Sequence, residues 1–389
     1  MLDILGMGIV IPVLPKLVKE VSGLGDDQTS YMYGLLATLY SVMQFLFAPV
    51  LGSLSDRYGR RPVILIALLG VGLDYFLLAW APTLWWLFLG RALSGITSAN
   101  ISAATAYIAD VSPPEKRAAN FGMVGAAFGV GFVLGPAFGG WLGDYGLRVP
   151  FVVAGVITLL NWLYGLIVLP ESLKRENRRS FSLARANPVG ALLDLRRYPM
   201  VLGLSMAYFL YMISHTVYPA CWVLYADYRY DWGPKEVGLS LAYVGVMAAI
   251  VQGGLTRKVI PKFGEKRTAI VCLLVSATAY VFYGIVSQGW MVYVIITVGA
   301  LAGMSTPAIQ GMISKSVGDD EQGGVQGSLS SLNSVAGILG IPLATGLFGF
   351  FVSKNAPVTL PGAPFFAAAL LALAATTVAF RSFVAARTN

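Results

Sequence analysis

Charged residues are scarce in this chain of 389 residues. Asp, Glu, Lys and Arg together make up 12%, which is about half of the roughly 25% usual in soluble domains. Hydrophobic residues account for 57%, and the mean hydropathy is +0.71. So few charges cannot cover a water-facing surface of this size. The composition therefore excludes a soluble enzyme, a disordered protein and a secreted disulfide scaffold, and it predicts a polytopic membrane protein.

Cysteine and histidine are nearly absent. The two cysteines, Cys221 and Cys272, both lie in apolar runs, which argues against a disulfide framework. The single histidine, His215, has no Cys or Asp partners in a metal-binding pattern. The chain also has no G-x-x-x-x-G-K-[ST] loop, so direct use of ATP is not expected. We expect no metal, no cofactor and no enzymatic activity.

Apolar runs between turns and charges predict an all-α membrane protein of twelve transmembrane helices. The runs lie at 1–20, 31–52, 62–82, 84–109, 118–142, 149–169, 199–226, 234–254, 267–287, 290–315, 323–352 and 362–382. The first is short, and Met1 lies only two residues before Asp3, which leaves room for a missing N-terminal stretch.

One long polar segment, residues 170–198, divides the chain into residues 1–169 and residues 199–389. GRALSGITSA at 90–99 is similar to GALAGMSTPA at 299–308, which indicates a weak internal repeat. We therefore expect two pseudo-symmetric six-helix bundles joined by a cytoplasmic central loop. Repeated six-span halves are typical of alternating-access transporters.

Positive charge is distributed unevenly over the two predicted faces. One face holds 20 of the 27 Lys and Arg residues, the other holds six, and Arg91 lies within a span. The positive-inside rule then places both termini and the central loop in the cytoplasm, in a plasma membrane such as a bacterial inner membrane. The same distribution explains the net charge of +8 without a nucleic-acid partner.

The loop after the second span reads G-S-L-S-D-R-Y-G-R-R-P over residues 52–62. Its glycines permit a tight turn and close helix approach. Asp56 is a single negative charge among three arginines, a combination suited to a breakable ionic latch at the cytoplasmic mouth. The gating candidates are Gly52, Asp56, Arg57, Gly59, Arg60 and Arg61.

The fifth span is rich in glycine and reads G-A-A-F-G-V-G-F-V-L-G-P-A-F-G-G over residues 125–140. The pairs Gly125/Gly129, Gly131/Gly135 and Gly135/Gly139 have the small-xxx-small spacing that allows close helix contact. Pro136 removes a backbone donor and can kink the span. The residues of interest are Gly131, Gly135, Pro136, Gly139 and Gly140.

These two motifs carry a resemblance. The loop at 52–62 resembles the motif of the major facilitator superfamily, and the fifth span is similar to the antiporter motif of its drug exporters. L-D-I-L-G-M-G-I-V-I-P-V-L-P at 2–15, L-D-Y at 73–75 and L-G-R-A-L-S-G-I-T at 89–97 resemble the tetracycline/proton antiporters in order and spacing. The resemblance implies a drug/proton antiporter of the major facilitator fold.

The resemblance also implies that Asp3, Asp74 and Arg91 are the membrane-embedded charges that couple transport to protons. The same family is expected to carry an acidic residue in its ninth span. Here the corresponding stretch, L-V-S-A-T at 274–278, has none. Proton coupling would then rest on the first half of the chain.

The energetic cost of a charge inside a membrane points to the same three residues independently of the resemblance. A charge at mid-membrane costs roughly 2.5–3.5 kcal/mol on insertion scales, so it must be paired or face water. Arg91 stays protonated, and it can hold a nearby carboxylate ionised until a proton or a substrate arrives. The alternative is a static ion pair between Arg91 and Asp74, and for Asp3 a position near the membrane surface.

Polar and aromatic residues recur on single helix faces in four spans. Arg91, Gly95, Ser98, Ser102 and Thr105 share a face of the fourth span. The seventh span carries an aromatic column on which a planar ligand could stack. The substrate-binding candidates are Ser98, Ser102, Tyr208, Tyr211, His215, Tyr218, Trp222, Gln310, Gln326 and Asn333. Packing between helices is the alternative for each stripe.

Together these features predict a secondary active transporter that exports a hydrophobic or amphipathic small molecule, such as a tetracycline-like drug, in exchange for protons. We expect a monomer whose partners are the drug, protons and membrane lipid. Two alternatives remain open. One is an uptake carrier or uniporter for a small organic solute on the same fold, and the other is a non-transporting membrane receptor.

Overall fold

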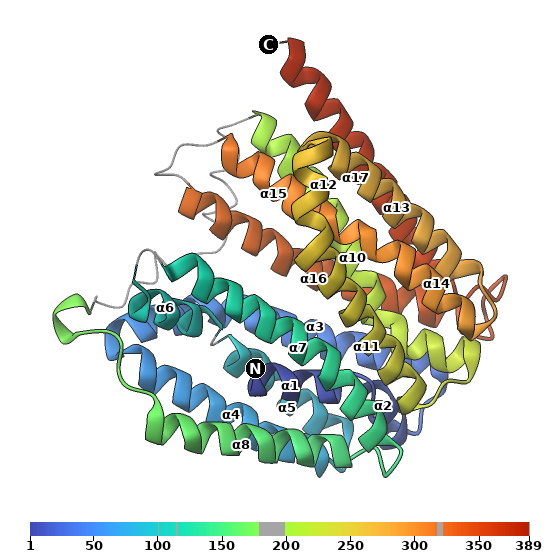
Figure 1. Cartoon of the computed structure of the whole chain (residues 1–389). Coiled ribbons are helices and arrows are strands. Elements are labelled where there is room, and N and C mark those ends of the chain that lie inside the picture. The colour runs from blue at the N-terminus through green and yellow to red at the C-terminus, as the bar shows by residue number, and fades with distance from the viewer. Residues whose placement is uncertain (100, 114–115, 179–198, 317–321, 389) are drawn as a thin grey trace. The chain divides into compact units, whose positions relative to one another are not determined.

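The computed structural model describes residues 1–389 except 100, 114–115, 179–198, 317–321 and 389, and every regular element in that part is helical (Figure 1). The α-helices are α1 (Leu2–Val10), α2 (Leu14–Ser22), α3 (Asp26–Tyr58), α4 (Arg60–Ala79), α5 (Leu84–Ser98), α6 (Ile101–Val111), α7 (Arg117–Gly143), α8 (Val149–Val168), α10 (Pro199–Tyr230), α11 (Pro234–Ile250), α12 (Thr256–Phe263), α13 (Glu265–Ile285), α14 (Gly289–Gly299), α15 (Ser305–Lys315), α16 (Gln322–Val352) and α17 (Ala363–Thr388). Shorter segments are the 3₁₀ turns η2 (Arg175–Asn177) and η5 (Ala300–Met304) and the π-helical turn η4 (Val251–Leu255).

The twelve predicted spans all correspond to helices of the described chain. Within the residues that the structure describes, ten helices are long and apolar enough to cross a membrane, by length and composition. Two of these ten each consist of three consecutive helical segments. They are α11–η4–α12 over Pro234–Phe263 and α14–η5–α15 over Gly289–Lys315. The remaining two spans, the first and the fourth, are each divided into two shorter helices.

The first predicted span is divided at a proline, so the single helix expected over residues 1–20 is corrected. Helix α1 ends at Val10 and α2 begins at Leu14. Pro12 lies between them and has no backbone N–H to continue a helix, whereas Pro15 is tolerated in the first turn of α2. The fourth span is divided between Ser98 of α5 and Ile101 of α6.

The chain forms two compact units. Unit 1 comprises Met1–Leu24, Leu39–Asn187 and Gly233–Ala242. Unit 2 comprises Gly25–Thr38, Pro188–Trp232 and Tyr243–Asn389. Each unit therefore contains one helical segment from the other half of the sequence. The division into residues 1–169, the loop 170–198 and residues 199–389 stays a prediction, and residues 179–198 lie outside the described part.

Unit 1 is built around helices that are far apart in sequence. Helix α4 lies along α8, and α1 lies between α7 and α8 (Figure 1). Apolar side chains fill the contacts, with Leu78 and Phe151 fully buried. A polar residue on the faces that meet in these contacts is therefore held away from lipid.

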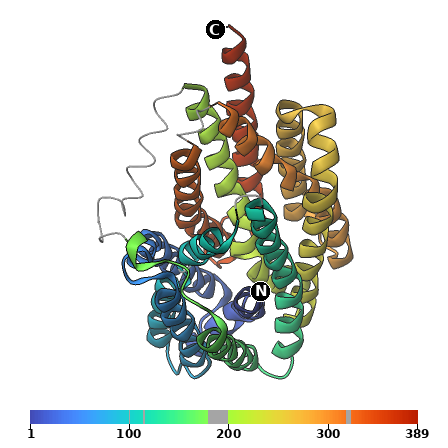
Figure 2. The same cartoon turned by 60° about the vertical axis from the view of Figure 1, so that its left-hand side comes forward.

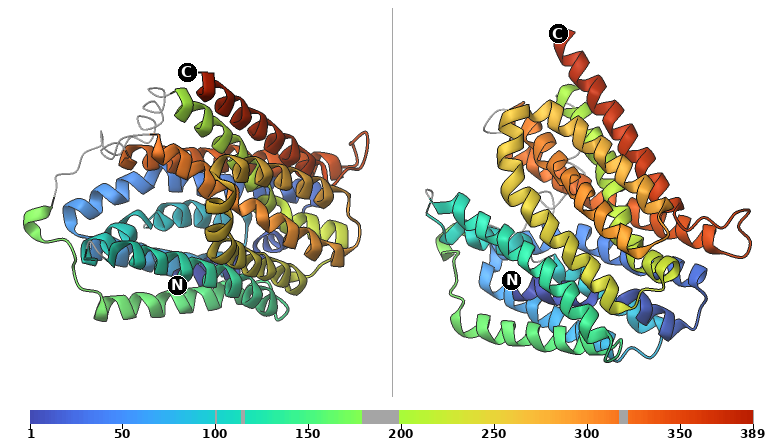
Figure 3. Two further views of the ribbon diagram at one scale, coloured as in Figure 1. Left: turned by 45° about the horizontal axis from the view of Figure 1, so that its top comes forward. Right: turned by 45° about the vertical axis from the view of Figure 1, so that its right-hand side comes forward.

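Unit 2 is organised around α10, which lies beside α16 and α17, while α13 lies beside α15 and α17 (Figures 2 and 3). Its core is lined by aliphatic and small residues, among them Leu204, Ile309 and Ala375, each fully buried. Tyr208 and Tyr211 belong to the same core. The packing of α10 therefore decides which members of the predicted aromatic column can reach a ligand.

Candidate functional site

A buried carboxylate lies inside unit 1. Asp74 on α4 is 2% exposed. The Ser94 hydroxyl on α5 donates a hydrogen bond to its Oδ2 atom, whereas its Oδ1 atom has no hydrogen-bond partner among the described residues. Gly90 leaves room there, since a Cβ at that position would lie 2.9 Å from Oδ1. A buried carboxylate with one free oxygen is suited to accept a proton.

Arg91 lies one helical turn before Ser94, on the same face of α5. Its Cζ atom lies 4.3 Å from the centre of the Tyr40 ring on α3, a cation–π arrangement. Among the described residues no hydrogen bond or ion pair joins Arg91 to Asp74. The direct static ion pair is therefore not found in the described structure, where Arg91 Nε and Asp74 Oδ1 are both buried without a hydrogen-bond partner.

A second acid with a buried carboxylate oxygen lies on α1. Asp3 is in the first turn of that helix, and its Oδ1 atom is buried without a hydrogen-bond partner among the described residues. One turn further along α1, Gly6 lies against Thr158 of α8 and Tyr75 of α4. Asp3 and Asp74 therefore belong to one packed unit.

The glycines of the fifth predicted span lie on α7 and line two helix contacts. A Cβ at Gly135 would lie 2.6 Å from the Cα atom of Gly8, and a Cβ at Gly139 would overlap the backbone of Ile9. Gly131 lies against Ile4 of the same helix. Glycine is required at these positions because α1 and α7 touch backbone to backbone.

The two ends of this glycine-rich stretch differ in what they contact. Gly140 lies against Pro234 and Gly238 at the beginning of α11, and the Pro136 carbonyl faces Gly238. A Cβ at Gly125 or Gly129 would meet nothing within 4 Å in the described chain. The close contact predicted for the Gly125/Gly129 pair is therefore wrong, and tight packing begins at Gly131.

The loop between α3 and α4 forms a network of charged side chains in unit 1. Arg60, only 9% exposed, pairs with Asp56 at 2.5 Å and with Asp110 of α6 at 3.2 Å. Its guanidinium also donates to the Ser55 hydroxyl at 2.6 Å. Gly59 has φ +107°, a conformation that favours glycine, and it places the chain for α4 to begin at Arg60.

The segment after α8 completes this network. Glu171 accepts a hydrogen bond from the backbone N–H of Arg60 at 2.9 Å, so a carboxylate 111 residues away caps the first turn of α4. Ser172 donates to Asp110 at 3.1 Å. Arg61 donates to the Leu166 carbonyl at 2.7 Å. We name Asp56, Arg60, Asp110 and Glu171 the latch.

The polar stripe of the fourth span packs against α3. Gly95 lies against the backbone of Tyr40, and the Ser102 hydroxyl donates to the Ala48 carbonyl at 3.2 Å. Ser98 is 3% exposed. The prediction that this face lines a cavity is corrected for Gly95 and Ser102, because their contacts are those of an interhelical interface.

The aromatic column of the seventh span lies on α10 and is largely core. Tyr211 and Trp222 are 2% and 0% exposed, and Tyr211 donates to the Ala302 carbonyl at 3.3 Å. Trp222 stacks on half-buried Tyr218 with ring centres 4.9 Å apart. The expectation of a cavity wall is therefore corrected for Tyr208, Tyr211 and Trp222, which the surrounding helices cover.

Other candidates of unit 2 remain accessible. His215 is exposed, and its ring centre lies 6.0 Å from that of Tyr211. Asn333 on α16 is exposed as well. Half-buried Gln310 on α15 donates to the Tyr208 hydroxyl at 3.3 Å. The side chain of Gln326 lies outside the described residues.

Three residues of the candidate site and the latch were not predicted from the sequence. Ser94 and Tyr40 contact the charges of unit 1, and Glu171 caps the latch. Ser94 could have been found, because it follows Arg91 by three residues and so shares its helix face. Nothing local in the sequence indicates that Tyr40 or Glu171 meets its partner.

The sequence matches known families over its whole length. The family model described as Major Facilitator Superfamily matches residues 1–341 and 258–388. The chain is 41% identical to the tetracycline resistance protein, class C, of Escherichia coli, covering 96% of this chain and 93% of that protein. It is 36% identical to the class H protein of Pasteurella multocida, with coverages of 91% and 87%.

Solved structures agree on the fold. The human organic anion transporter MFSD10 (TETRAN) superposes with a TM-score of 0.71 at 23% identity, covering 97% of this chain and 96% of that one. A bacterial homologue of the human lysosomal transporter Spinster, in an inward-facing and unoccupied conformation, gives 0.74 at 18% identity, with coverages of 98% and 96%. The chain belongs to the Major Facilitator Superfamily and, within it, to the family of the tetracycline resistance proteins.

Proposed function

We propose that this drug-efflux transporter carries tetracycline-like amphipathic compounds out of a bacterial cytoplasm in exchange for protons, acting as a monomer with both termini inside. Relatives named for tetracycline resistance, at 34–41% identity over most of the chain, support the substrate class. The excess of Lys and Arg on one face supports the orientation.

The observation that carries the coupling proposal is the environment of Asp74. Its carboxylate is buried in unit 1, one oxygen accepts from Ser94, and the other oxygen has no hydrogen-bond partner among the residues that the structure describes. A buried charge of this kind is costly and is most often retained for function. Asp74 is therefore the proposed proton carrier, and Ser94 is a positioning residue that fixes its orientation.

Arg91 has a distinct role in this proposal. It stays charged throughout the cycle and rests on the Tyr40 ring rather than on a carboxylate. The residue before Arg91, Gly90, lies against the Asp74 carboxylate, so protonation of Asp74 removes a negative charge close to Arg91. The attraction between α4 and α5 then weakens, which provides a physical link between proton binding and helix rearrangement.

The latch is proposed to stabilise one conformation of the cytoplasmic side. Arg60 holds two carboxylates at once, and Glu171 attaches the segment after α8 to the beginning of α4. Asp56 and Asp110 are partly exposed although Arg60 is largely buried, so water can replace the ionic contacts when the cluster opens during transport.

Drug contacts are proposed for accessible polar groups of unit 2. His215 and Asn333 are exposed, and Gln310 is half-buried beside Tyr208. An amphipathic drug needs a few polar partners in a mostly apolar site. Ser98 and Ser102 are not favoured as drug contacts, because one is buried and the other bonds to α3.

The proposal is tested with the purified protein in proteoliposomes. A pH gradient directed as in export should drive tetracycline uptake by wild type, and Asp74→Asn should abolish that gradient-driven uptake. Ser205→Ala is the matched control, since Ser205 is equally buried at 2% exposure but lies on α10 in unit 2. Gradient-driven uptake by Asp74→Asn at the wild-type rate would refute the coupling role.

The direction of transport is a separate measurement. Cells lacking their own drug pumps should accumulate less tetracycline when they express this chain. Greater accumulation would instead support an uptake carrier, and unchanged distribution of all drugs tested would support a receptor.

A further inference from the structure

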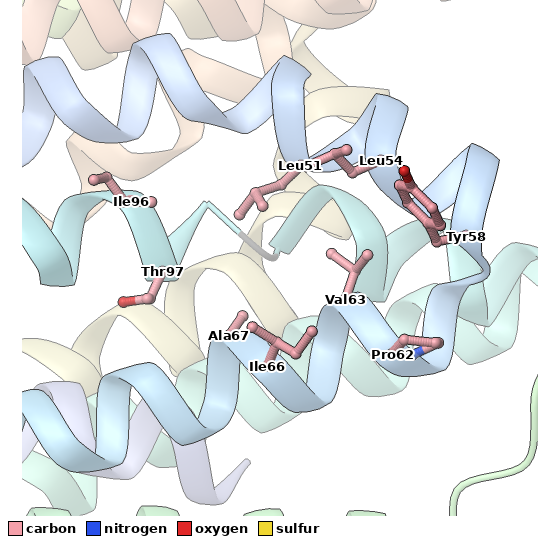
Figure 4. Close-up of a pocket in the computed structure, with 9 residues that line it drawn as sticks. All are labelled: Leu51, Leu54, Tyr58, Pro62, Val63, Ile66, Ala67, Ile96 and Thr97. Atoms are coloured by element: carbon pink, nitrogen blue, oxygen red, sulfur yellow. The ribbon is translucent and has the colours of Figure 1, made fainter. Parts of the chain in front are cut away.

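A lateral groove in unit 1 is not used by the proposed transport cycle. It has a volume of about 530 Å³ and lies between the end of α3, the beginning of α4 and the end of α5 (Figure 4). Tyr58 and Pro62 lie at the end nearest the α3–α4 turn, and Ile96 and Thr97 lie at the opposite end (Figure 4). The nine lining residues are Leu51, Leu54, Tyr58, Pro62, Val63, Ile66, Ala67, Ile96 and Thr97.

The walls of the groove are apolar. The Thr97 hydroxyl is bonded to the Leu93 carbonyl of its own helix at 2.8 Å, so it offers no free donor to a ligand. Gly70 lies against the Thr97 methyl group and closes the inner end, because it lets α4 and α5 touch there. The mouth is open, since Ile66 and Tyr58 are 71% and 52% exposed.

Positive charge borders the end nearest the turn. The Arg57 Cζ atom lies 5.1 Å from the centre of the Tyr58 ring, which lines the groove. Arg61 directly precedes Pro62 and donates to the Leu166 carbonyl of α8. Within the described chain no carboxylate lies at ion-pair distance from either arginine, because the adjacent acid, Asp56, pairs with Arg60.

We propose that this groove binds one acyl chain of an anionic phospholipid, whose phosphate is held at the α3–α4 turn by Arg57 and Arg61. An apolar slot open to the side matches an acyl chain. Arg57, which lies beside the Tyr58 ring and has no ion-pair partner in the described chain, matches an acidic headgroup. A drug would need several polar groups along the walls for orientation. The lining residues supply two hydroxyls, that of Thr97, which already donates to the Leu93 carbonyl, and that of Tyr58 at the end nearest the turn. On the proposed orientation the site lies in the cytoplasmic leaflet.

Native mass spectrometry of the purified protein tests this assignment. Phosphatidylglycerol and phosphatidylethanolamine are supplied in equal amounts, and the bound fraction of each is measured. Wild type should retain one phosphatidylglycerol preferentially. Arg57→Gln should reduce that preference about fivefold, the effect of one cation at a membrane surface, while an acyl chain remains bound.

Ala67→Trp fills the groove and should lower retention of either lipid by about tenfold or more, since several CH₂ groups lose their contacts. Ile66→Asn, at the exposed mouth, is a second variant that does not depend on core repacking. Leu160→Trp is the matched control, because Leu160 is a 60% exposed apolar residue on α8, away from the groove.

Three results would overturn the proposal. The first is equal retention of the two lipids by wild type. The second is unchanged retention in both Ala67→Trp and Ile66→Asn. The third is displacement of the lipid by added tetracycline with loss of drug binding in Ala67→Trp, which would make the groove a drug site. None of these results bears on proton coupling by Asp74, so this proposal and the proposed function fail separately.

Discussion

Ser94 donates a hydrogen bond to one carboxylate oxygen of Asp74, and the other oxygen of that carboxylate is buried without a hydrogen-bond partner in the described part of the chain. The pair joins α5 to α4 inside unit 1. Half of the carboxylate is therefore held in a fixed orientation while the other half is free to take a proton. This division of roles makes Ser94 the most informative unpredicted residue of the site.

Removing the Ser94 hydroxyl should slow proton-driven drug transport. A hydrogen bond to a charged group contributes about 1.5–3 kcal/mol, so Ser94→Ala is expected to lower the rate about tenfold to a hundredfold. Ser94→Thr keeps the hydroxyl and should restore most of the rate, which a merely structural defect would not explain. Initial rates in proteoliposomes at several drug concentrations measure the effect. Equal rates for Ser94→Ala and wild type would contradict the positioning role.

The glycine contacts between α1 and α7 give a stability prediction. Gly139→Ala should destabilise the protein by about 1–3 kcal/mol, because its Cβ would overlap the Ile9 backbone. Gly129→Ala is the control from the same helix, since a Cβ there meets nothing within 4 Å. It should leave stability unchanged or raise it by about 0.5–1 kcal/mol. Thermal unfolding in detergent measures both variants, and equal midpoints would show that the α1–α7 contact is not tight.

The latch predicts a large effect for Arg60. Arg60→Gln leaves the carboxylates of Asp56 and Asp110 without their partner, and the loss should reach about 3 kcal/mol because Arg60 is largely buried. Arg267→Gln is the control, as Arg267 is an exposed arginine near the beginning of α13. It should change stability by less than about 0.5 kcal/mol. A double-mutant cycle between Arg60 and Asp110 separates their pairing from other effects. Zero coupling energy would remove Asp110 from the latch.

His215 and Trp222 share the predicted aromatic column but should respond differently to substitution. Trp222→Ala should cost about 3–5 kcal/mol of stability because Trp222 is fully buried in unit 2. His215→Gln should leave the unfolding midpoint near that of wild type and weaken drug binding, since His215 is exposed. Equilibrium binding of tetracycline to the purified variants checks the second expectation. Unchanged affinity in His215→Gln would exclude this residue from the drug site.

Much of the fold could be predicted because the membrane imposes a simple rule on length and hydropathy. Apolar runs of about 20 residues predict spans, and each predicted span corresponds to a helix or a divided helix. The divisions follow local chemistry only in part. Pro12 explains the break in the first span, whereas nothing in the sequence predicted the π-helical turn Val251–Leu255 or the 3₁₀ turn Ala300–Met304. These two irregular turns lie against each other in unit 2.

Helix periodicity predicts which residues share one face of a helix, but it does not predict which other helix packs against that face. Gly95 and Ser102 share one face as predicted, and that face meets α3. Trp222 and His215 lie seven residues apart on α10, yet one is covered and the other is exposed. Contacts between distant segments, such as Glu171 with Arg60, depend on tertiary packing and have no local pattern.

Drug-driven proton movement through Asp74 tests the central claim most directly. Proteoliposomes containing the protein and a pH indicator are given a tetracycline gradient with no initial pH difference. Wild type should move protons against the direction of drug flow, and Asp74→Asn should carry drug down its gradient with no proton flux. Proton flux in Asp74→Asn equal to that of wild type would show that the coupling carboxylate lies elsewhere.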